Sequence, residues 1–453
     1  MKSFDLIVIG SGSGLEVSSE AADRGLSVAV VEPGPFGGTC LNRGCIPSKM
    51  LIHSADVVET IRRADLFGIS AEVSAIDWEF IVKRVADTIG ADAEMVERGN
   101  RDSPNITVFK TSARFVGPKR LDVGGEEITA ETIVVAAGTR PRIPNIEGLT
   151  DVPFITSDEA LRLPTQPRRL VIYGGGFIAA ELAHFFGALG TDVTILYRGS
   201  RLLRKEDDDV ATRFTEVYGR RFNTVLNATI ENVCRQGDEI VVETASDGVT
   251  RSITTDALLL ATGRVPNTDT LEVAESGVTV DANGFVKTDE YLETEIPGIW
   301  ALGDIVGRYL LKHSANLEAA HVAHNVFSPE SKVAVDYHAM PQAVFASPQV
   351  GSVGLTEREA NERGIPYAVG RYDYIDTAYG SSIEDKDGFV KVLVHRETRE
   401  VLGGHIIGSE ASILVQEIAN AMRLRLTTDA FAQAIYVHPA LPEVVQRAFG
   451  AIS

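Results

Sequence analysis

The feature that most constrains this 453-residue chain is a strand, glycine turn, helix and strand unit that occurs twice. The first copy reads FDLIVIGSGSGLEVSSEAADRGLSVAVVE, and the second reads RRLVIYGGGFIAAELAHFFGALGTDVTILYRG. Each copy opens with a continuous apolar run, which is typical of a strand buried on both faces of a parallel sheet. Such units bind dinucleotides at the glycine turn. The two copies lie 164 residues apart, from Gly10 to Gly174, and predict two nucleotide-binding domains.

The remaining segments predict further strands of the first domain and a separate C-terminal domain. Apolar runs that end at Gly138 and Asp304 predict two more strands of the first domain. From about residue 337 the pattern alternates, as in FVKVLVHRE, which is typical of an antiparallel sheet with flanking helices. We therefore expect an α/β fold with two Rossmann-like nucleotide-binding domains and an α+β C-terminal domain. The predicted boundaries are 1–147, 148–268, 269–336 (returning to the first domain) and 337–453.

Charge and cysteine content exclude several classes of function. The formal net charge of −20 disfavours binding to nucleic acid or to anionic membranes. No apolar run approaches the 18 or more residues that would suggest a membrane span. The three cysteines, Cys40, Cys45 and Cys234, are too few for a disulfide scaffold and indicate a reducing compartment. We therefore expect a cytoplasmic protein in which Cys234 is inert.

The first glycine turn carries Gly10, Gly12 and Gly14. The dinucleotide fingerprint places its third glycine at position 15, where this chain has Leu15. This departure concerns the packing of helix on strand rather than the binding of phosphate. Glu32 ends the second strand, where an acidic side chain binds a ribose hydroxyl. An ordinary strand–helix turn is the alternative.

The second glycine turn carries Gly174, Gly176 and Ala179, which match the fingerprint. No acidic residue ends its second strand. Arg198 stands there instead, and Arg204 follows within the next turn. Because cations bind a 2′-phosphate, the second site is predicted to prefer NADPH. The alternative is that both arginines are solvated surface charges.

The segment GGTCLNRGCIPSKM places Cys40 and Cys45 five positions apart, before a helix expected to begin near Pro47. A helix N-terminus and Arg43 would both stabilise a thiolate and lower its pKa. A metal site would need more ligands at suitable spacing, and only His53 lies nearby. A structural disulfide is disfavoured in a reducing compartment. The pair is therefore interpreted as a redox dithiol, with no metal.

Two further pairs of residues have the chemistry that a dithiol enzyme needs. His438 in YVHPALPE is followed by Glu443, which is placed to orient the imidazole as an acid–base near neutral pH. Lys49 lies one helical turn after the second cysteine, and Glu181 lies in the helix after the second glycine turn. The alternatives are a structural histidine–proline segment and unrelated surface charges.

These segments together resemble the pyridine nucleotide-disulfide oxidoreductases of class I. The resemblance covers essentially the whole chain and rests on GGTCLNRGCIPSK, both glycine fingerprints, ATGRVPN, ALGD and HPALPE. Three stretches, GSGSG, YLLKHSANLEAAHVAHN and YVHPALPEVV, are most similar to the mycothione reductases of this family. The resemblance implies a homodimer with FAD and NADPH domains, a central part and a dimerisation domain, and one FAD per subunit.

The resemblance also implies roles for individual residues. Cys40 corresponds to the thiol that attacks the substrate, and Cys45 to the thiol beside the flavin. His438, with Glu443, corresponds to the acid–base that completes the partner subunit's site. The Lys49–Glu181 pair lies beside the flavin in this comparison. The other residues implied in cofactor binding are Gly38, Thr39, Gly138, Gly263, the flavin ribityl contact Asp304 and the aromatic gate Phe177.

The expected function is the NADPH-dependent reduction of a small thiol disulfide such as mycothione, with bis-γ-glutamylcystine or glutathione disulfide as other candidates. One alternative is an NAD-linked dihydrolipoamide dehydrogenase within a larger complex. A second is a non-catalytic flavoprotein, which the intact cysteines and histidine disfavour. A third is metal-ion reduction. The chain has no cysteine pair at its C-terminal end, so mercuric reductase is disfavoured.

Overall fold

The structure is a computed structural model that describes residues 1–452. The chain forms two compact units. Unit 1 contains residues 1–48, 82–142 and 263–337, and unit 2 contains residues 49–81, 143–262 and 338–453. The four domain boundaries inferred from the sequence remain a prediction. Among the helices of residues 1–452, none has the length and hydropathy of a membrane span.

Unit 1 is built on a sheet whose parallel strands follow the order β3-β2-β1-β6, with β17 also paired to β6. The pairing of β17 with β6 confirms that the IWALGD segment returns to the first sheet. Two short strands, β5 and β4, extend the sheet in antiparallel fashion. The bounds are β1 (Lys2–Ile9), β2 (Val28–Val31), β3 (Ile106–Phe109), β4 (Ala113–Gly117), β5 (Arg120–Val123), β6 (Glu126–Val135) and β17 (Ile299–Ala301).

Both faces of this parallel sheet are buried, as its continuous apolar runs predict. Helices α1 (Leu15–Asp23) and α8 (Lys312–Phe327) contact each other, and their side chains share a core with Val8 and Val30. A second core cluster contains Ile133 and the side chains of β4 and β5. Each large apolar side chain buried here contributes about 1.5–3 kcal/mol of transfer free energy. The sheet therefore gives a rigid base for the loops at its carboxyl edge.

Unit 2 contains a second parallel sheet, ordered β11-β10-β9-β15-β8. Helix α6 contacts this sheet and follows its central strand, and a three-stranded antiparallel sheet, β12-β13-β14, belongs to the same unit. The bounds are β8 (Phe154–Ile155), β9 (Arg169–Tyr173), α6 (Phe177–Ala188), β10 (Asp192–Leu196), α7 (Asp208–Arg221), β11 (Asn223–Val225), β12 (Ala228–Gln236), β13 (Glu239–Ser246), β14 (Val249–Thr255) and β15 (Ala257–Leu260).

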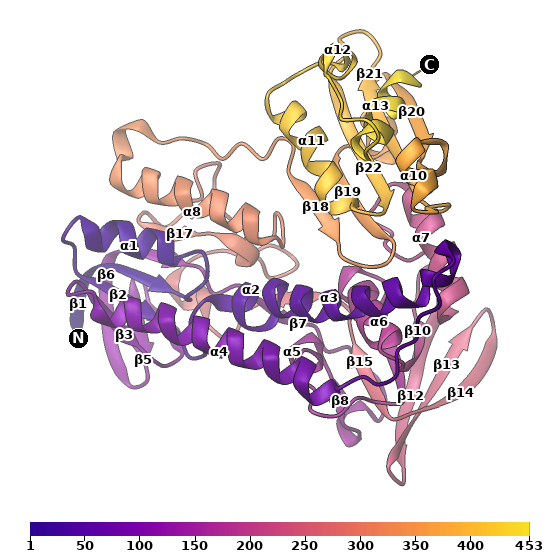
Figure 1. Ribbon diagram of the computed structural model, residues 1–453. Helices are drawn as coiled ribbons and strands as arrows, with labels where there is room; N and C mark the ends of the chain where they lie inside the picture. Colours follow the sequence, from indigo (N-terminus) through magenta and orange to yellow (C-terminus); the bar gives the residue numbers. More distant parts are fainter. Residues whose placement is uncertain (453) are drawn as a thin grey trace. The chain divides into compact units, whose positions relative to one another are not determined.

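The C-terminal part of unit 2 is a five-stranded antiparallel sheet, ordered β18-β19-β22-β21-β20. Helices α11 and α13 pack against it around one apolar core (Figure 1). This arrangement confirms the predicted antiparallel sheet with flanking helices. The bounds are β18 (Pro341–Val344), β19 (Gln349–Gly354), β20 (Tyr367–Asp373), β21 (Phe389–His395), β22 (Val401–Gly408), α11 (Ala411–Arg423), α12 (Thr428–Gln433) and α13 (Pro442–Gly450).

Strand β21 is buried almost throughout. Its sequence alternates apolar and polar residues, yet six of its seven residues are buried. Its charged residue, Lys391, lies inside the protein with 1% of its side chain exposed. The physical reason is that carboxylates from other elements of unit 2 surround its ammonium group.

The remaining elements connect these sheets or lie at their edges. Their bounds are α2 (Gly38–Arg43), α3 (Cys45–Arg62), η1 (Ala64–Phe67), α4 (Trp78–Asp102), β7 (Thr139–Pro141), η2 (Leu149–Asp151), α5 (Ser157–Ala160), β16 (Arg264–Pro266), η3 (Val273–Ser276), η4 (Gly303–Ile305), η5 (Pro329–Ser331), α9 (Glu357–Glu362), η6 (Tyr374–Asp376) and α10 (Ala378–Ser382).

Candidate active site

The first glycine turn has the backbone that a pyrophosphate requires. Gly10 follows β1 with φ of +102°, and a Cβ atom there would lie 2.4 Å from the carbonyl oxygen of Ala136. Gly14 supplies the close contact of helix on strand, because its Cβ would lie 2.8 Å from Cβ of Ala136 and 2.9 Å from Val8. Leu15 at the usual third position therefore leaves the packing intact. The turn, in which Gly10, Gly12 and Ser13 are partly exposed, fits the phosphates of a dinucleotide such as FAD.

Glu32 is held at the end of β2 by three hydrogen bonds. Its Oε2 atom accepts from the backbone N–H and the hydroxyl of Ser11, at 3.0 and 2.8 Å. Its Oε1 atom accepts from the N–H of Gly34, at 2.8 Å. The carboxylate is thereby fixed against the glycine turn, where the ribose of a bound dinucleotide lies in this fold. Gly38 and Thr39 open helix α2, which follows this turn.

Asp304 lies in the short helix η4, just beyond β17, rather than on the strand itself. It accepts a hydrogen bond from Oγ1 of Thr139 at 2.9 Å, and burial raises the pKa of its carboxyl. Arg264 donates to the hydroxyl of Thr139 at 2.7 Å and to its carbonyl oxygen at 2.7 Å. Asn267 donates to the carbonyl oxygen of Ala137 at 2.7 Å.

The supporting residues Thr139, Arg264 and Asn267 were not among the site residues inferred from the sequence. Two of them belong to ATGRVPN, and the third follows Gly138, so motif position could have indicated them. The segments meet because β7 pairs with β16. Gly138 and Gly263 flank this pair, and each carbonyl oxygen accepts a backbone hydrogen bond from the other segment.

The two cysteines lie on two helices rather than in a loop before one helix. Cys40 is in the middle of α2, and Cys45 is the first residue of α3. The predicted start near Pro47 is wrong by two residues, because proline is accepted within the first helical turn. Gly44 separates the helices with φ of −141° and ψ of −117°. A Cβ atom there would lie 2.9 Å from the carbonyl oxygen of Thr39.

The two thiols have different environments. Cys40 is partly buried and Cys45 is exposed. The hydrogen bond with Cys45 and partial burial raise the pKa of Cys40, and the positive charge of Lys312 only partly opposes this. The expectation of a lowered pKa is therefore wrong for Cys40, and Lys312 rather than Arg43 is the cation that acts on it. The N-terminus of α3 favours negative charge at Cys45.

Lys312 is a residue of this region that the sequence did not single out. It begins helix α8 and donates a hydrogen bond from Nζ to the hydroxyl of Ser13 at 2.7 Å. Ser13 belongs to the first glycine turn and donates in turn to Oδ1 of Asn316 at 2.9 Å. This chain ties the start of α8 to the glycine turn. Among residues 1–452 no cluster of three or more His, Cys, Asp or Glu side chains could hold a metal ion.

The second glycine turn joins β9 to α6, and Arg198 and Arg204 lie in the segment after β10. Both guanidinium groups are exposed, and within the described residues neither has an ion-pair partner. By contrast, Arg201 of the same segment is bound to Asp208 at 3.0 Å. Two cations without counter-ions at this strand end fit a phosphate group. Phe177 begins α6 with 45% of its surface exposed.

Lys49 and Glu181 form a pair, as one of the two interpretations predicted. Nζ of Lys49 donates to both carboxylate oxygens of Glu181, at 2.8 and 2.9 Å. Glu181 is 4% exposed and also accepts from the backbone N–H of Phe345 at 3.0 Å. The ammonium group lies 4.6 Å from the centre of the Phe345 ring. The pairing is thus observed, while its place beside a flavin remains a prediction.

Replacing Glu181 by leucine is expected to destabilise the protein by roughly 2–4 kcal/mol, because Lys49 and the Phe345 N–H both lose their acceptor. Urea denaturation of the variant and the wild type measures this difference. The double change Lys49→Met with Glu181→Leu is the control, and it should recover part of the lost stability since no unpaired charge remains. An unchanged denaturation midpoint in the single variant would contradict this account.

His438 and Glu443 are joined at the start of helix α13. Nδ1 of His438 lies 2.9 Å from Oε1 of Glu443, whose other oxygen accepts from the N–H of Ala440 at 3.1 Å. The hydrogen bond to His438 lowers the pKa of Glu443. The carboxylate fixes the tautomer that carries hydrogen on Nδ1, so Nε2 is left to exchange protons. The side chain of His438 is 72% exposed.

The fold and the geometry agree with known protein families. Residues 4–325 match the pyridine nucleotide-disulphide oxidoreductase family, and residues 340–449 match the dimerisation domain of that family. The chain belongs to this family. It is accordingly a flavin-dependent disulfide oxidoreductase, an enzyme of the EC 1.8.1 type, and the cofactors of this group are FAD and NADPH.

Three relatives illustrate the similarity. Mycothione reductase from Mycobacterium tuberculosis is 42% identical over 462 residues, which cover 99% of each chain. Dihydrolipoyl dehydrogenase from Chlamydia trachomatis is 34% identical, covering 98% of this chain and 95% of the other. The structure of the HOCl-induced flavoprotein disulfide reductase RclA from Escherichia coli has a TM-score of 0.88 and 28% identity, covering 98% and 99%.

Proposed function

We propose that this protein is an NADPH-dependent reductase of a low-molecular-weight disulfide of the mycothione type, acting in the cytoplasm through Cys40 and Cys45. The observation that carries the proposal is the asymmetric dithiol. Cys45 is the first residue of α3, whose N-terminus favours negative charge, and Cys40 lies on the neighbouring helix α2, within hydrogen-bonding distance of Cys45. In a pair arranged in this way, one thiol exchanges with an external disulfide to form a mixed disulfide. The other thiol then attacks that mixed disulfide and forms the disulfide within the protein.

Gly10, Gly12, Gly14 and Glu32 would hold FAD, which would supply the two-electron transfer from NADPH to the Cys40–Cys45 disulfide. Cys40 must then lose its proton to attack the substrate RSSR, and His438 is the proposed base. The attack forms a Cys40–SR mixed disulfide and expels RS⁻, which His438 protonates. The thiolate of Cys45 next attacks the sulfur of Cys40, which restores the protein disulfide and expels a second RS⁻, and this RS⁻ takes up the H⁺ that enters the overall balance. The balance is NADPH, H⁺ and RSSR to NADP⁺ and two RSH.

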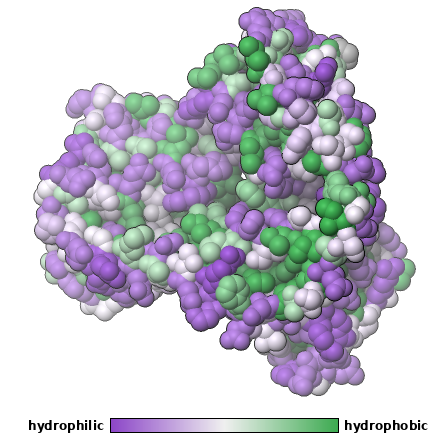
Figure 2. All heavy atoms as spheres, in the orientation of Figure 1, coloured by the Kyte–Doolittle hydropathy of each residue, from purple (hydrophilic) through white to green (hydrophobic). Residues whose placement is uncertain are grey.

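We propose that the enzyme is a homodimer in which His438 completes the partner subunit's site. The family's dimerisation domain supports a dimer. Apolar side chains stand exposed in the same region, with Ile413 at 65%, Leu424 at 70%, Ile435 at 100% and Val437 at 74%. Figure 2 shows hydrophobic residues at the surface of the part of the chain drawn in yellow in Figure 1. Exposed apolar surface of this kind is typical of an interface.

The preference for NADPH rests on Arg198 and Arg204. Changing both to alanine is expected to raise KM for NADPH about 10- to 100-fold and to leave KM for NADH nearly unchanged, because only NADPH has a 2′-phosphate. Steady-state kinetics with both coenzymes measure the effect. Arg235→Ala is the matched control, since that exposed guanidinium lies on β12, outside the loop of Arg198 and Arg204, and is paired with Asp238. An unchanged KM for NADPH in the double variant would remove this part of the proposal.

A second candidate function is that of a dihydrolipoyl dehydrogenase, because the relative of that name from Chlamydia trachomatis is 34% identical to this chain. Such an enzyme would use NAD and run in the opposite direction. The absence of an acidic residue at the end of β10 and the two exposed arginines disfavour NAD. Steady-state assays with lipoamide and small-thiol disulfides, each with NADH and NADPH, separate the two candidates.

A further inference from the structure

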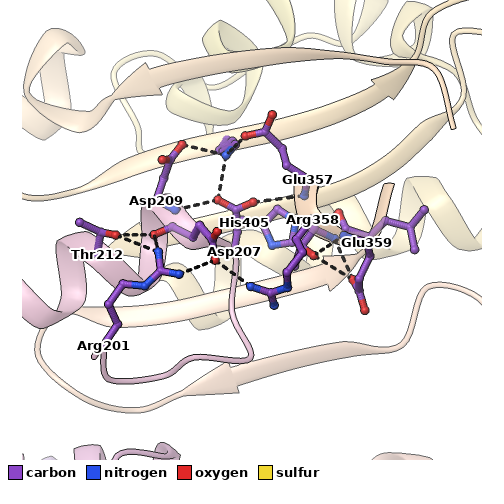
Figure 3. Close-up of polar contacts among 12 residues, drawn as sticks. Arg201, Asp207, Asp209, Thr212, Glu357, Arg358, Glu359 and His405 are labelled. Atoms are coloured by element: carbon purple, nitrogen blue, oxygen red, sulfur yellow. Dashed lines mark hydrogen bonds and ion pairs between the residues drawn. The ribbon is translucent and has the colours of Figure 1, made fainter. Parts of the chain in front are cut away.

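One buried lysine of unit 2 binds three carboxylates. Nζ of Lys391, on β21, donates to Asp207 at 2.8 Å, to Asp209 at 2.7 Å and to Glu357. Figure 3 shows the three carboxylates converging on one nitrogen atom. Burial opposes the charge of Lys391, but these hydrogen bonds raise its pKa, so the side chain stays an ammonium ion. The cluster therefore binds β21 to α7 and α9 through charge.

Asp207 connects this cluster to the start of helix α7. It is the N-cap residue, because its Oδ1 atom accepts from the backbone N–H of Asp209 at 3.1 Å. The same oxygen accepts from Lys391, and the side chain of Asp207 is 1% exposed. A neutral N-cap would suffice for the helix alone. The buried ion pair in addition fixes the position of the helix start relative to the C-terminal sheet.

Glu206 provides a second anchor at the preceding position. Its carboxyl accepts from the hydroxyl of Ser352 at 2.7 Å and from Nε2 of Gln342 at 3.2 Å, on strands β19 and β18. The residue is 7% exposed, and burial raises its pKa. Two consecutive side chains, Glu206 and Asp207, thus join one end of a loop to the C-terminal sheet.

The anchored loop is the segment that carries the predicted phosphate-binding arginines. It runs from the end of β10 to the start of α7 and contains Arg198 and Arg204. Arg204 lies only two residues before the first anchor. The loop is further fixed where Arg201 and Arg358 both bind Asp208, at 3.0 and 2.7 Å (Figure 3). Neither phosphate-binding candidate takes part in these contacts.

We infer that Lys391 is a positioning residue for NADPH, which holds the loop of Arg198 and Arg204 in the geometry that binds the 2′-phosphate. This inference rests on the proposed coenzyme role of those two arginines. Lys391 acts through Asp207, since its own charge is used within the cluster. Displacing a binding group by about 1 Å can cost roughly 100-fold, so a loosened anchor should be measurable at the phosphate.

The test is Lys391→Met in the full-length flavoprotein. Calorimetric titration with adenosine 2′,5′-bisphosphate should show about 10-fold weaker binding, while binding of 5′-AMP stays unchanged. KM for NADPH should rise similarly, with KM for NADH and kcat with NADH preserved. Arg169→Met is the matched control, because Arg169 also binds two carboxylates, Glu239 and Asp256, at the opposite end of β9. It should leave the binding of both nucleotides unchanged.

If the Lys391→Met variant does not fold, a second variant with a smaller change in the cluster tests the same inference. Asp209→Asn removes one partner whose side chain is 48% exposed and retains the N–H that caps the helix. It should weaken binding of the bisphosphate in the same direction by a smaller factor. Equal losses for the bisphosphate and 5′-AMP, or no loss in either variant, would overturn the inference.

The two proposals fail separately. If the Arg198→Ala and Arg204→Ala double variant binds the bisphosphate normally, the coenzyme role of the arginines is wrong. If that double variant loses the 2′-phosphate preference and Lys391→Met keeps it, only the positioning role is wrong. The account predicts that Lys391→Met adds little in the arginine-free background, because residues that act on one contact are not additive.

Discussion

Replacing Cys40 by serine is expected to lower the rate of disulfide reduction by roughly 10⁴-fold or more, because Cys40 is the thiol proposed to form the mixed disulfide. Cys45 alone cannot form the disulfide within the protein that takes electrons from the flavin, so the exchange cycle cannot be completed. The variant should still oxidise NADPH when a small quinone accepts the electrons, since both glycine turns and Arg198 and Arg204 are untouched. Steady-state assays with the two acceptors separate the dithiol step from the coenzyme step.

The matched control is Cys234→Ser, which removes an exposed cysteine on the antiparallel strand β12. We expect wild-type rates with both acceptors, because no part of the proposed mechanism uses Cys234. Substantial disulfide reduction by Cys40→Ser would contradict the dithiol mechanism. Reduction of metal ions by that variant, with disulfide reduction lost, would instead point to direct chemistry of the flavin.

Replacing His438 by alanine is expected to lower kcat for disulfide reduction about 10²- to 10⁴-fold, the usual contribution of an acid–base group. Cys40 must lose its proton before it attacks, because the thiolate is the nucleophile, and Nε2 of His438 is the nitrogen that Glu443 leaves available. Glu443→Gln is the graded control and should cost less, because the imidazole remains. Oxidation of NADPH by a quinone should be unaffected in both variants.

Mixing subunits tests whether the base acts across the dimer. Alone, subunits with Cys40→Ser are expected to be inactive, and subunits with His438→Ala are expected to keep at most about 1% of wild-type activity. In a mixed dimer, one site combines an intact Cys40 with an intact His438 of the partner subunit. Random exchange should therefore restore about a quarter of wild-type activity, because half of the dimers are mixed and each has one working site. If the residues act within one subunit, the mixture stays inactive.

The parallel sheets could be predicted from the sequence, because a strand that is buried on both faces consists of a continuous apolar run. Continuous apolar runs at β1, β9 and β15 encode parallel strands, and the glycine turns encode where the helices begin. The pairing of Lys49 with Glu181 could be named because each lies on an element that a motif marks. In both cases a local pattern fixes the position of a residue.

Contacts between segments far apart in the sequence could not be predicted, because no local sequence pattern indicates them. Thr139 meets Arg264 across 125 residues, and Lys391 meets Asp207 across 184 residues. Alternation in FVKVLVHRE marks Lys391 as polar but does not show that carboxylates will enclose it. The break at Gly44 likewise depends on the close approach of Thr39. Helix signals alone therefore placed the second cysteine before the helix instead of at its first residue.

The most direct test of the central claim is the steady-state oxidation of NADPH and NADH by the purified flavoprotein with four disulfides. These are mycothione, glutathione disulfide, bis-γ-glutamylcystine and lipoamide. The account predicts a strong preference for NADPH and rapid turnover of one small-thiol disulfide, with mycothione the expected substrate. Turnover of NADH with lipoamide alone would contradict the account and place the protein among the dihydrolipoyl dehydrogenases.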